Sequence, residues 1–212
     1  MRCRSFALVA AFAMFAVAIA GGSSLRAEEG EMSKEAADAY FTRVFAGNYG
    51  KQDKSYACFL RRYDAPHLAS HPLQKVSAMV LLVTAEKNEE DKTQIGHSFR
   101  LGLKFRNRAG NFDSSGYCMK PSESKVAADK LDFHCGVDCD GGGISVEMSN
   151  NDKSALIRLE SIRIWKNNKP EDEGFALSGG ADDRVFRLDR VSNEQCKSLI
   201  TDRKELAAMR TK

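Results

Sequence analysis

The chain has 212 residues, of which 42% are hydrophobic and 29% charged, and its formal net charge at pH 7 is +3. That excess lies in the first 27 residues: without Arg2, Arg4 and Arg26 the basic side chains, 32 less these three, equal the 29 acidic ones. A neutral chain gives no argument for nucleic acid, so we expect no such partner.

Residues 1–27 have the pattern of a secretory signal peptide. Two arginines precede an unbroken apolar run at residues 6–20, and small residues follow up to Ala27. The run is shorter than the roughly 20 residues that a bilayer-spanning helix needs. We therefore expect residues 28–212 to be one globular domain with no membrane segment. The Ala-rich signal is typical of bacteria and indicates a periplasmic or secreted protein.

The first half of this domain reads as a helix followed by strands. An apolar stripe with helical spacing begins after Ser33, an N-cap residue, and ends before Gly47, a helix terminator. Residues 79–83 are apolar on both parities, which predicts a strand covered on both faces. The predicted strands are residues 56–63, 74–86, 97–107 and 112–120.

A basic set lies in the third of these strands. Arg100, Lys104 and Arg106 alternate with apolar residues, and Arg108 completes the set just after the strand. Half-buried strands commonly carry charges on the outer face, so we interpret the set as a solvated strand face.

A hairpin is predicted at residues 131–149. Its first strand alternates apolar with polar residues, so Cys135 points to the core and His134 to the other face. Residues 140–143, Asp-Gly-Gly-Gly, supply the positive φ angles that a tight hairpin turn requires. We therefore expect a structural turn here.

The last part of the chain alternates strands and turns before a final helix. The strand at residues 155–165 changes its apolar parity, which predicts a bulge near Glu160 and Ser161. Residues 192–195 fit a capping box, and a helix is predicted from there to about residue 209. Two further strands are expected at residues 175–178 and 184–191.

These elements predict a mainly β, single-domain fold. About eight strands joined by short turns, with an N-terminal and a C-terminal helix, favour an antiparallel curled sheet or an up-and-down barrel. The helices would pack outside or across an open end. The alternative is a two-sheet β-sandwich.

Five cysteines follow the signal peptide, and in an oxidising compartment we expect disulfides with one cysteine left over. Cys58 with Cys196 would tie the first strand to the last helix and close a long loop. A second bridge is expected among Cys118, Cys135 and Cys139.

A zinc or redox site is the alternative use of the hairpin, because His134, Cys135 and Cys139 lie close in sequence. The CxxxC spacing differs from the CxxC of redox and zinc motifs, however. His67 and His71 form a second candidate pair. Prolines bracket them and no third ligand can be placed. We therefore expect disulfides and turns at these positions, and no metal or cofactor.

The sequence contains no GxSxG elbow, phosphate loop or helical zinc signature, so we expect no enzymatic activity. A curled sheet can hold an apolar small ligand in its interior or mouth, and Trp165 and Phe175 are the candidate lining residues. The alternative is a periplasmic protein-interaction module, such as an inhibitor or accessory subunit that binds another envelope protein.

Four short segments follow the bacterial-type signal: RYDA at residues 62–65, HLASHP at 67–72, CGVDCDGGG at 135–143 and VFRL at 185–188. Together they resemble exported bacterial proteins of unassigned function. The resemblance implies export. It implies no activity and supplies no functional residues.

Overall fold

The computed structural model describes residues 32–123, 130–166, 169 and 174–210. Residues 31–212 form one compact unit. The predicted signal peptide, residues 1–27, lies outside the described residues. In the part of the chain that the structure describes, no helix has the length and apolar character needed to cross a bilayer.

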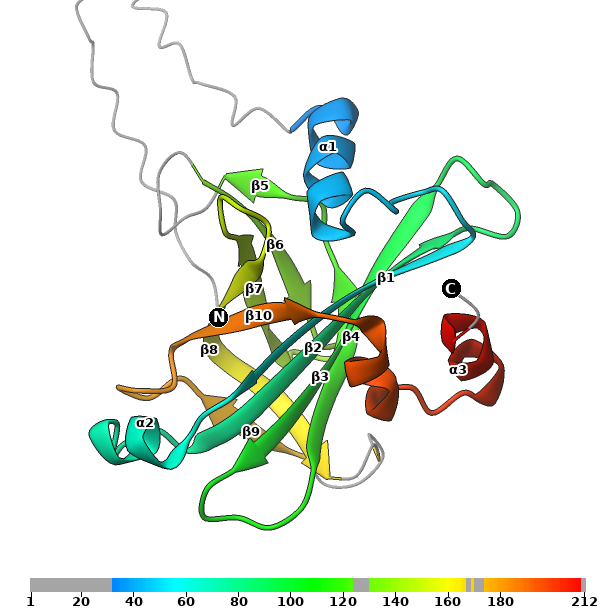
Figure 1. Ribbon diagram of the computed structural model, residues 1–212. Coiled ribbons are helices and arrows are strands. Elements are labelled where there is room, and N and C mark those ends of the chain that lie inside the picture. The colour runs from blue at the N-terminus through cyan, green and yellow to red at the C-terminus, as the bar shows by residue number, and fades with distance from the viewer. Residues whose placement is uncertain (1–31, 124–129, 167–168, 170–173, 211–212) are drawn as a thin grey trace, which may run out of the picture. The chain divides into compact units, whose positions relative to one another are not determined.

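The unit is mainly β, as predicted, and all its strand pairs are antiparallel. Figure 1 shows the strands curling round one another, with the helices at the periphery. In chain order the elements are α1 (Lys34–Val44), β1 (Lys54–Arg62), α2 (Ala65–Ser70), β2 (Val76–Lys87), β3 (Ile95–Phe105), β4 (Phe112–Cys118), β5 (Ser122–Glu123), β6 (Leu131–Gly136), β7 (Gly142–Met148), β8 (Ser154–Lys166), β9 (Phe175–Ser178), β10 (Val185–Val191), the 3₁₀ helix η1 (Asn193–Leu199) and α3 (Arg203–Arg210).

The strands form one sheet that closes into a ring. Their order is β10-β1-β2-β3-β4-β6-β7-β8, and β10 pairs again with β8. β5 pairs with β6, and β9 extends the sheet beside the second half of β8. This confirms the predicted curled, barrel-like sheet rather than the two sheets of the sandwich alternative.

β8 changes its pairing at the predicted bulge. Ser161 is opposite Gly143 and Leu159 is opposite Ile144, so Glu160 has no partner in the β7 ladder. The first half of β8 pairs with β10 and the second half with β9. The bulge therefore divides the strand between the closed ring and its extension.

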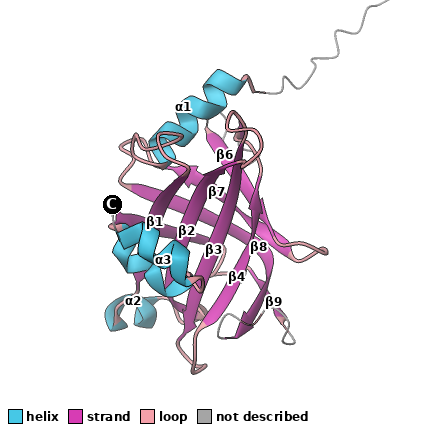
Figure 2. Cartoon of the chain, turned by 90° about the vertical axis from the view of Figure 1, so that its right-hand side faces the viewer, coloured by secondary structure: helices cyan, strands magenta, loops and turns pink. Residues whose placement is uncertain are grey.

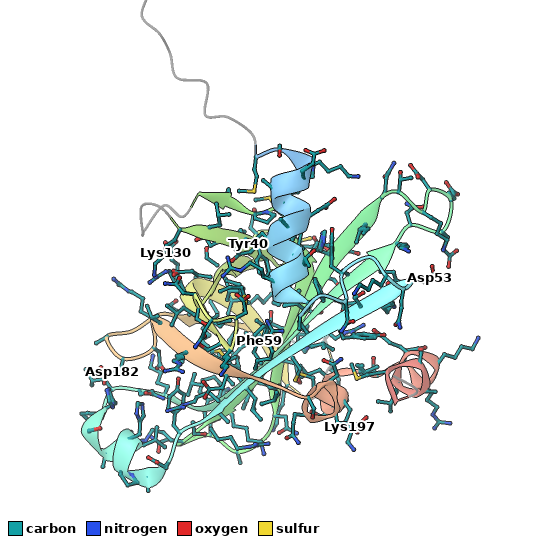
Figure 3. All side chains as sticks on the ribbon, turned by 45° about the horizontal axis from the view of Figure 1, so that its top comes forward. Tyr40, Asp53, Phe59, Lys130, Asp182 and Lys197 are labelled. Carbon is teal, nitrogen blue, oxygen red and sulfur yellow. A yellow bond between two sulfur atoms is a disulfide. The ribbon has the colours of Figure 1, made fainter. Side chains whose placement is uncertain are left out.

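Large apolar side chains fill the interior of the ring, and Phe59 lies among them in Figure 3. Helix α1 covers one end because its apolar face, including Phe41, joins this core. The Tyr40 hydroxyl donates to the Leu131 carbonyl at 3.0 Å and accepts from the Met148 amide at 3.1 Å. Burial raises the pKa of Tyr40 to about 12. Both hydrogen bonds fix α1 to the β6–β7 hairpin.

A second apolar cluster lies on the outer face of the sheet, where η1 and α3 cover β1, β2 and β3 (Figure 2). Leu82 points outward into this cluster, while Leu81 points into the interior. β2 is therefore covered on both faces, as predicted. Glu205 of α3 accepts two hydrogen bonds from Arg100 of β3, at 3.0 and 2.9 Å, which holds the helix against the sheet.

The prediction of one continuous C-terminal helix is wrong. The segment is a 3₁₀ helix followed by a break and then α3. The Ser192 side chain makes no capping hydrogen bond, whereas the Asp202 carboxylate accepts from the Glu205 amide at 2.7 Å. Leu199 and Ile200 are both buried against the sheet, which an extended Ile200 permits. The break lets both parts of the segment contact the sheet.

Two predicted connections contain short elements. The polar connection between the predicted strand at residues 112–120 and the predicted hairpin contains β5, which pairs with β6; residues 124–129 lie outside the described part. The expected turn after β1 contains α2, whose first turn is capped by the Asp64 carboxylate accepting from the His67 amide at 2.8 Å. A capping hydrogen bond stabilises even a single helical turn, and pairing with β6 stabilises even the two residues of β5.

The hairpin turn differs in detail from the prediction. Positive φ angles fall on Cys139 (57°) and Asp140 (59°) as well as on Gly142 (68°), and not on all of residues 140–143. A Cβ at Gly142 would also collide with the Ser161 carbonyl oxygen. This glycine therefore allows β7 to approach β8 closely, in addition to turning the chain.

The structure contains two disulfides, Cys58–Cys196 and Cys118–Cys135, and Cys139 is an exposed free thiol. The first is the pairing that the sequence favoured. The second lies within the predicted set, and its cysteines are direct cross-strand partners in β4 and β6. Two buried disulfides are compatible with an oxidising compartment.

The Cys58–Cys196 disulfide closes the longer loop of the two and is expected to contribute more to stability. Its cysteines are separated by 138 positions, and in the chain-entropy model closing such a loop stabilises by about 4–5 kcal/mol. We predict that Cys58→Ala/Cys196→Ala lowers the free energy of unfolding by about that amount in urea titrations without reductant, whereas Cys139→Ser leaves it unchanged. Equal midpoints for the double variant and the wild type would contradict this.

His97 makes stability dependent on pH. Its ring stacks on Phe41 with centroids 3.9 Å apart, and its Nε2 lies 3.2 Å from the Tyr49 hydroxyl. Burial lowers the pKa of His97 from 6.5 to about 4. The protonated ring is therefore disfavoured in the folded state.

The unfolded chain binds this proton first as the pH falls below about 6.5. We predict a contribution that is fully present above pH 6.5 and lost by pH 4, amounting to up to about 3 kcal/mol. His97→Phe keeps a ring beside Phe41 and removes the proton. Urea titrations from pH 8 to pH 4 should show a flatter profile for the variant; identical profiles would count against this role.

Candidate functional site

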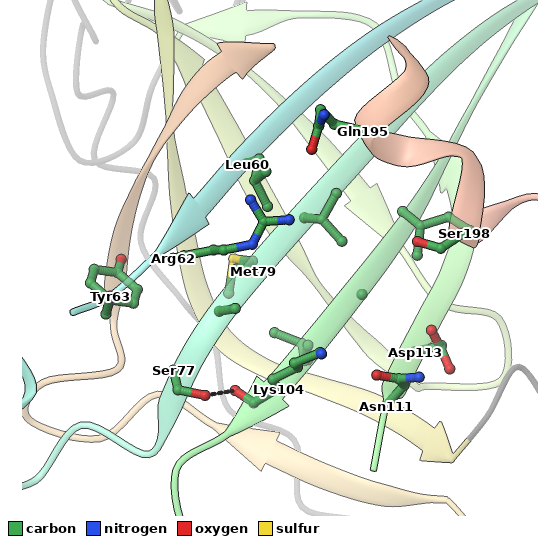
Figure 4. Close-up of a pocket in the computed structure, with 15 residues that line it drawn as sticks. Leu60, Arg62, Tyr63, Ser77, Met79, Lys104, Asn111, Asp113, Gln195 and Ser198 are labelled. Carbon is green, nitrogen blue, oxygen red and sulfur yellow. Dashed lines mark hydrogen bonds between the residues drawn. The ribbon is translucent and has the colours of Figure 1, made fainter. Parts of the chain in front are cut away.

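A groove of about 700 Å³ lies on the outer face of the sheet, between β1–β4 and η1 (Figure 4). This volume is in the range of small-molecule sites. Its floor comes from the strands and one wall from η1. It is the candidate functional site, and we call it the outer groove.

The hollow follows from small residues on β2 and β3. Cross-strand pairing aligns Ala78 with Arg62 on one side and Lys104 on the other, and the next outward-facing row aligns Val80 with Gly102. Ala78 and Gly102 present little or no side chain, while their neighbours in the rows are longer. The sheet surface is therefore depressed where the two rows meet.

Gly102 also allows η1 to dock. A Cβ at this position would lie 2.7 Å from Leu199 Cδ2 and 2.8 Å from Val80 Cγ1. Without it, Leu199 packs directly on the strand. Docking of Leu199 places Gln195 and Ser198, on the same 3₁₀ helix, at the groove wall. The Cys58–Cys196 disulfide also links this helix to β1.

Two cations stand over the groove. Arg62 and Lys104 are exposed, and neither forms an ion pair with any residue that the structure describes. Nearby Arg100 differs, because Glu205 binds its guanidinium. Arg61 is likewise paired, with Asp189 at 3.2 Å. The charges of Arg62 and Lys104 are thus available to a bound anion.

The remaining rim is polar. Asn111 and Asp113 border the groove from the β4 side, and Gln195 and Ser198 from η1 (Figure 4). Asp113 is buried and has a partner in the chain. The amides and the hydroxyl provide both donors and acceptors. The groove therefore combines positive charge, hydrogen-bonding groups and a small apolar floor.

The two predicted ligand-lining residues lie elsewhere. Phe175 lines a second pocket, of about 470 Å³, beside β9. Trp165 is buried on β8, where its backbone is opposite Asp113 of β4. It lines neither this pocket nor the outer groove. The structure does not bring Trp165 and Phe175 together in one site.

The predicted histidine pair, His67 and His71, lies in and just after α2. The rings of His67 and His71 stack with centroids 4.2 Å apart and planes 16° apart, and Tyr63 stacks on His67 at 4.5 Å. Nε2 of His67 lies 3.0 Å from Oε1 of Gln74. Over the described ranges, no three His, Cys, Asp or Glu side chains come together in an arrangement suited to a metal ion.

The hairpin residues point apart. His134 is exposed, Cys135 is fully buried in its disulfide, and Cys139 is exposed at the turn. The sulfur of Cys135 is bonded to Cys118 and is therefore not a free thiolate ligand.

The groove residues were missed from the sequence. The alternation in the sequence places Lys104 with Arg100 and Arg106 on a solvated strand face, and it gives no sign that Arg62 lies beside Lys104. The structure separates the three: Arg100 binds Glu205, and Arg106 donates to the carbonyls of Leu68 in α2 and of His71 just after it. Only the register between β1, β2 and β3 brings Arg62 to Lys104, and no single segment carries that signal.

Fold and site together define a disulfide-bonded, barrel-like β protein with a basic groove on its outer face. No protein-family model, curated protein or solved structure matches the chain.

The groove wall should depend on the missing side chain at Gly102. We predict that Gly102→Ala lowers the free energy of unfolding by about 1–3 kcal/mol, because Leu199 and Val80 must move. Gly96→Ala is the matched control on β3, since its nearest neighbour, the Glu86 carbonyl oxygen, is 3.9 Å from the added Cβ. Equal stabilities of the two variants in urea would contradict this packing.

Proposed function

We propose that this is a non-enzymatic, exported protein of the bacterial cell envelope that binds a small, anionic, hydroxyl-rich molecule in the outer groove. Sugar acids and sugar phosphates have this chemistry. The observation that carries the proposal is the pair of cations, Arg62 and Lys104, which flank Ala78 and have no acidic partner among the described residues.

The cation pair suits a single anionic group. Neighbouring strands lie about 4.8 Å apart, so the stems of Arg62 and Lys104 start about 10 Å apart across β2. Both side chains are long enough to reach a carboxylate or phosphate over Ala78. Arginine supplies a planar fork of donors and lysine a point charge, and both are effective partners of such oxygens.

The rest of the groove suits the body of such a molecule. Asn111, Gln195 and Ser198 line it and provide donors and acceptors for hydroxyl groups. Leu60 and Val80 provide apolar floor for carbon-bound hydrogens. A few polar groups around an apolar surface are the usual composition of a specific ligand site.

The proposed location has two supports. Disulfides persist in oxidising compartments, and this chain forms two. The pattern of residues 1–27 favours export to the periplasm or the medium.

The groove is supported by a closed sheet, so ligand binding requires no folding of the chain, which lowers the entropic cost of binding.

Calorimetric titration with glucose 6-phosphate, glucuronate and uncharged glucose tests the function. We predict binding of the two anions and not of glucose, and a loss of about tenfold or more in affinity for Arg62→Gln and for Lys104→Gln.

Arg61→Gln is the matched control. Arg61 is adjacent in sequence, but it does not line the groove and its charge is paired with Asp189 at 3.2 Å. Its removal should leave anion affinity unchanged. Equal affinities in all three variants, or no binding of either anion to the wild type, would contradict the proposal.

A further inference from the structure

The segments that line the second pocket lie at the end of the unit opposite α1 (Figure 1). We call this pocket the mouth pocket. Three segments line it: residues 72–75 before β2, residues 105–108 at the end of β3, and β9. We propose that the mouth pocket binds a small apolar monocarboxylic acid, with Arg108 as the partner of the carboxylate. This site is independent of the outer groove.

The charge of the mouth pocket is of one sign. Lys75, Arg106 and Arg108 line it, and none of its described lining residues is acidic. Arg106 has a structural role, because one of its terminal nitrogens donates to the carbonyls of Leu68 and His71 at 3.0 and 3.3 Å. Lys75 and Arg108 form no ion pair with a described residue. The pocket is therefore complementary to an anion.

Arg108 is held in place by aromatic rings. Its guanidinium carbon lies 4.2 Å from the centroid of the Phe175 ring and 5.1 Å from that of Phe112. Phenylalanine side chains carry no hydrogen-bond acceptor of the ordinary kind, so these contacts leave the N–H groups of Arg108 available to donate to a ligand. An arginine oriented in this way is suited to a carboxylate.

The walls beside Arg108 are apolar. Phe105 and Phe175 line the pocket with ring centroids 6.4 Å apart, and Leu177 and Leu73 line it as well. Leu73 is 63% exposed, so most of its apolar surface is accessible to a ligand. An apolar ligand body would cover both rings and Leu73.

Hydrogen bonds to two aspartate carboxylates hold one wall of the mouth pocket. The Asp183 carboxylate is fully buried and accepts from the amides of Lys75, at 2.7 Å, and Val76, at 3.2 Å. Asp182, labelled in Figure 3, accepts from the Leu73 amide at 3.1 Å. On the other side, β9 is paired with β8. The walls are thus positioned before any ligand arrives, which favours binding.

The proposal is tested by titrating the disulfide-bonded protein with 2-naphthoate and with its uncharged analogue 2-naphthamide. Arg108→Met keeps an unbranched apolar stem beside the rings and removes the charge and the N–H donors. We expect about a tenfold or greater loss of naphthoate affinity with naphthamide affinity unchanged. Phe175→Leu should weaken both probes, because it removes ring surface that both would contact.

Lys104→Gln is the control, since it changes the outer groove only. Its naphthoate affinity should equal that of the wild type, so failure of the groove function leaves this result unaffected. The proposal is overturned if the wild type does not bind naphthoate, if Arg108→Met binds it equally well, or if Arg108→Met loses both probes alike.

Discussion

The docking of η1 on the outer face of the sheet is the contact on which the candidate site depends. It rests on two features that lie far apart in sequence: the Cys58–Cys196 disulfide and the bare backbone of Gly102 under Leu199. The disulfide fixes where the segment lies, and the glycine fixes how closely it approaches. Together they convert a flat strand surface into a groove with a wall. The α3 helix adds a charged attachment through Glu205.

Side chains fill the interior of the ring, so the two candidate ligand sites lie at its surface. A ligand at the centre would have to displace side chains such as Phe59 and Phe99, which are completely buried and pack against their neighbours. Dense cores resist such displacement. The outer groove and the mouth pocket require no displacement, because both are open in the folded chain. They also differ in chemistry: one is rimmed by polar side chains, the other backed by aromatic rings.

Much of the fold follows from patterns that are local in the sequence. The alternation around Cys135 predicted its burial, and the phase change at Glu160 predicted the bulge. The site does not follow in this way, because Arg62 and Lys104 become neighbours only through the register of three strands. The break after Leu199 was missed for a related reason. Helical periodicity continues across it, and only contact with the sheet makes the break favourable.

The central claim is that the outer groove is a binding site for an anion. Mapping backbone amide chemical shifts during titration with glucose 6-phosphate tests it most directly. The largest changes are predicted at Ala78, Gly102 and Ser198, which line the groove from β2, β3 and η1. Changes confined to other surfaces, or no changes at saturating ligand, would contradict the account.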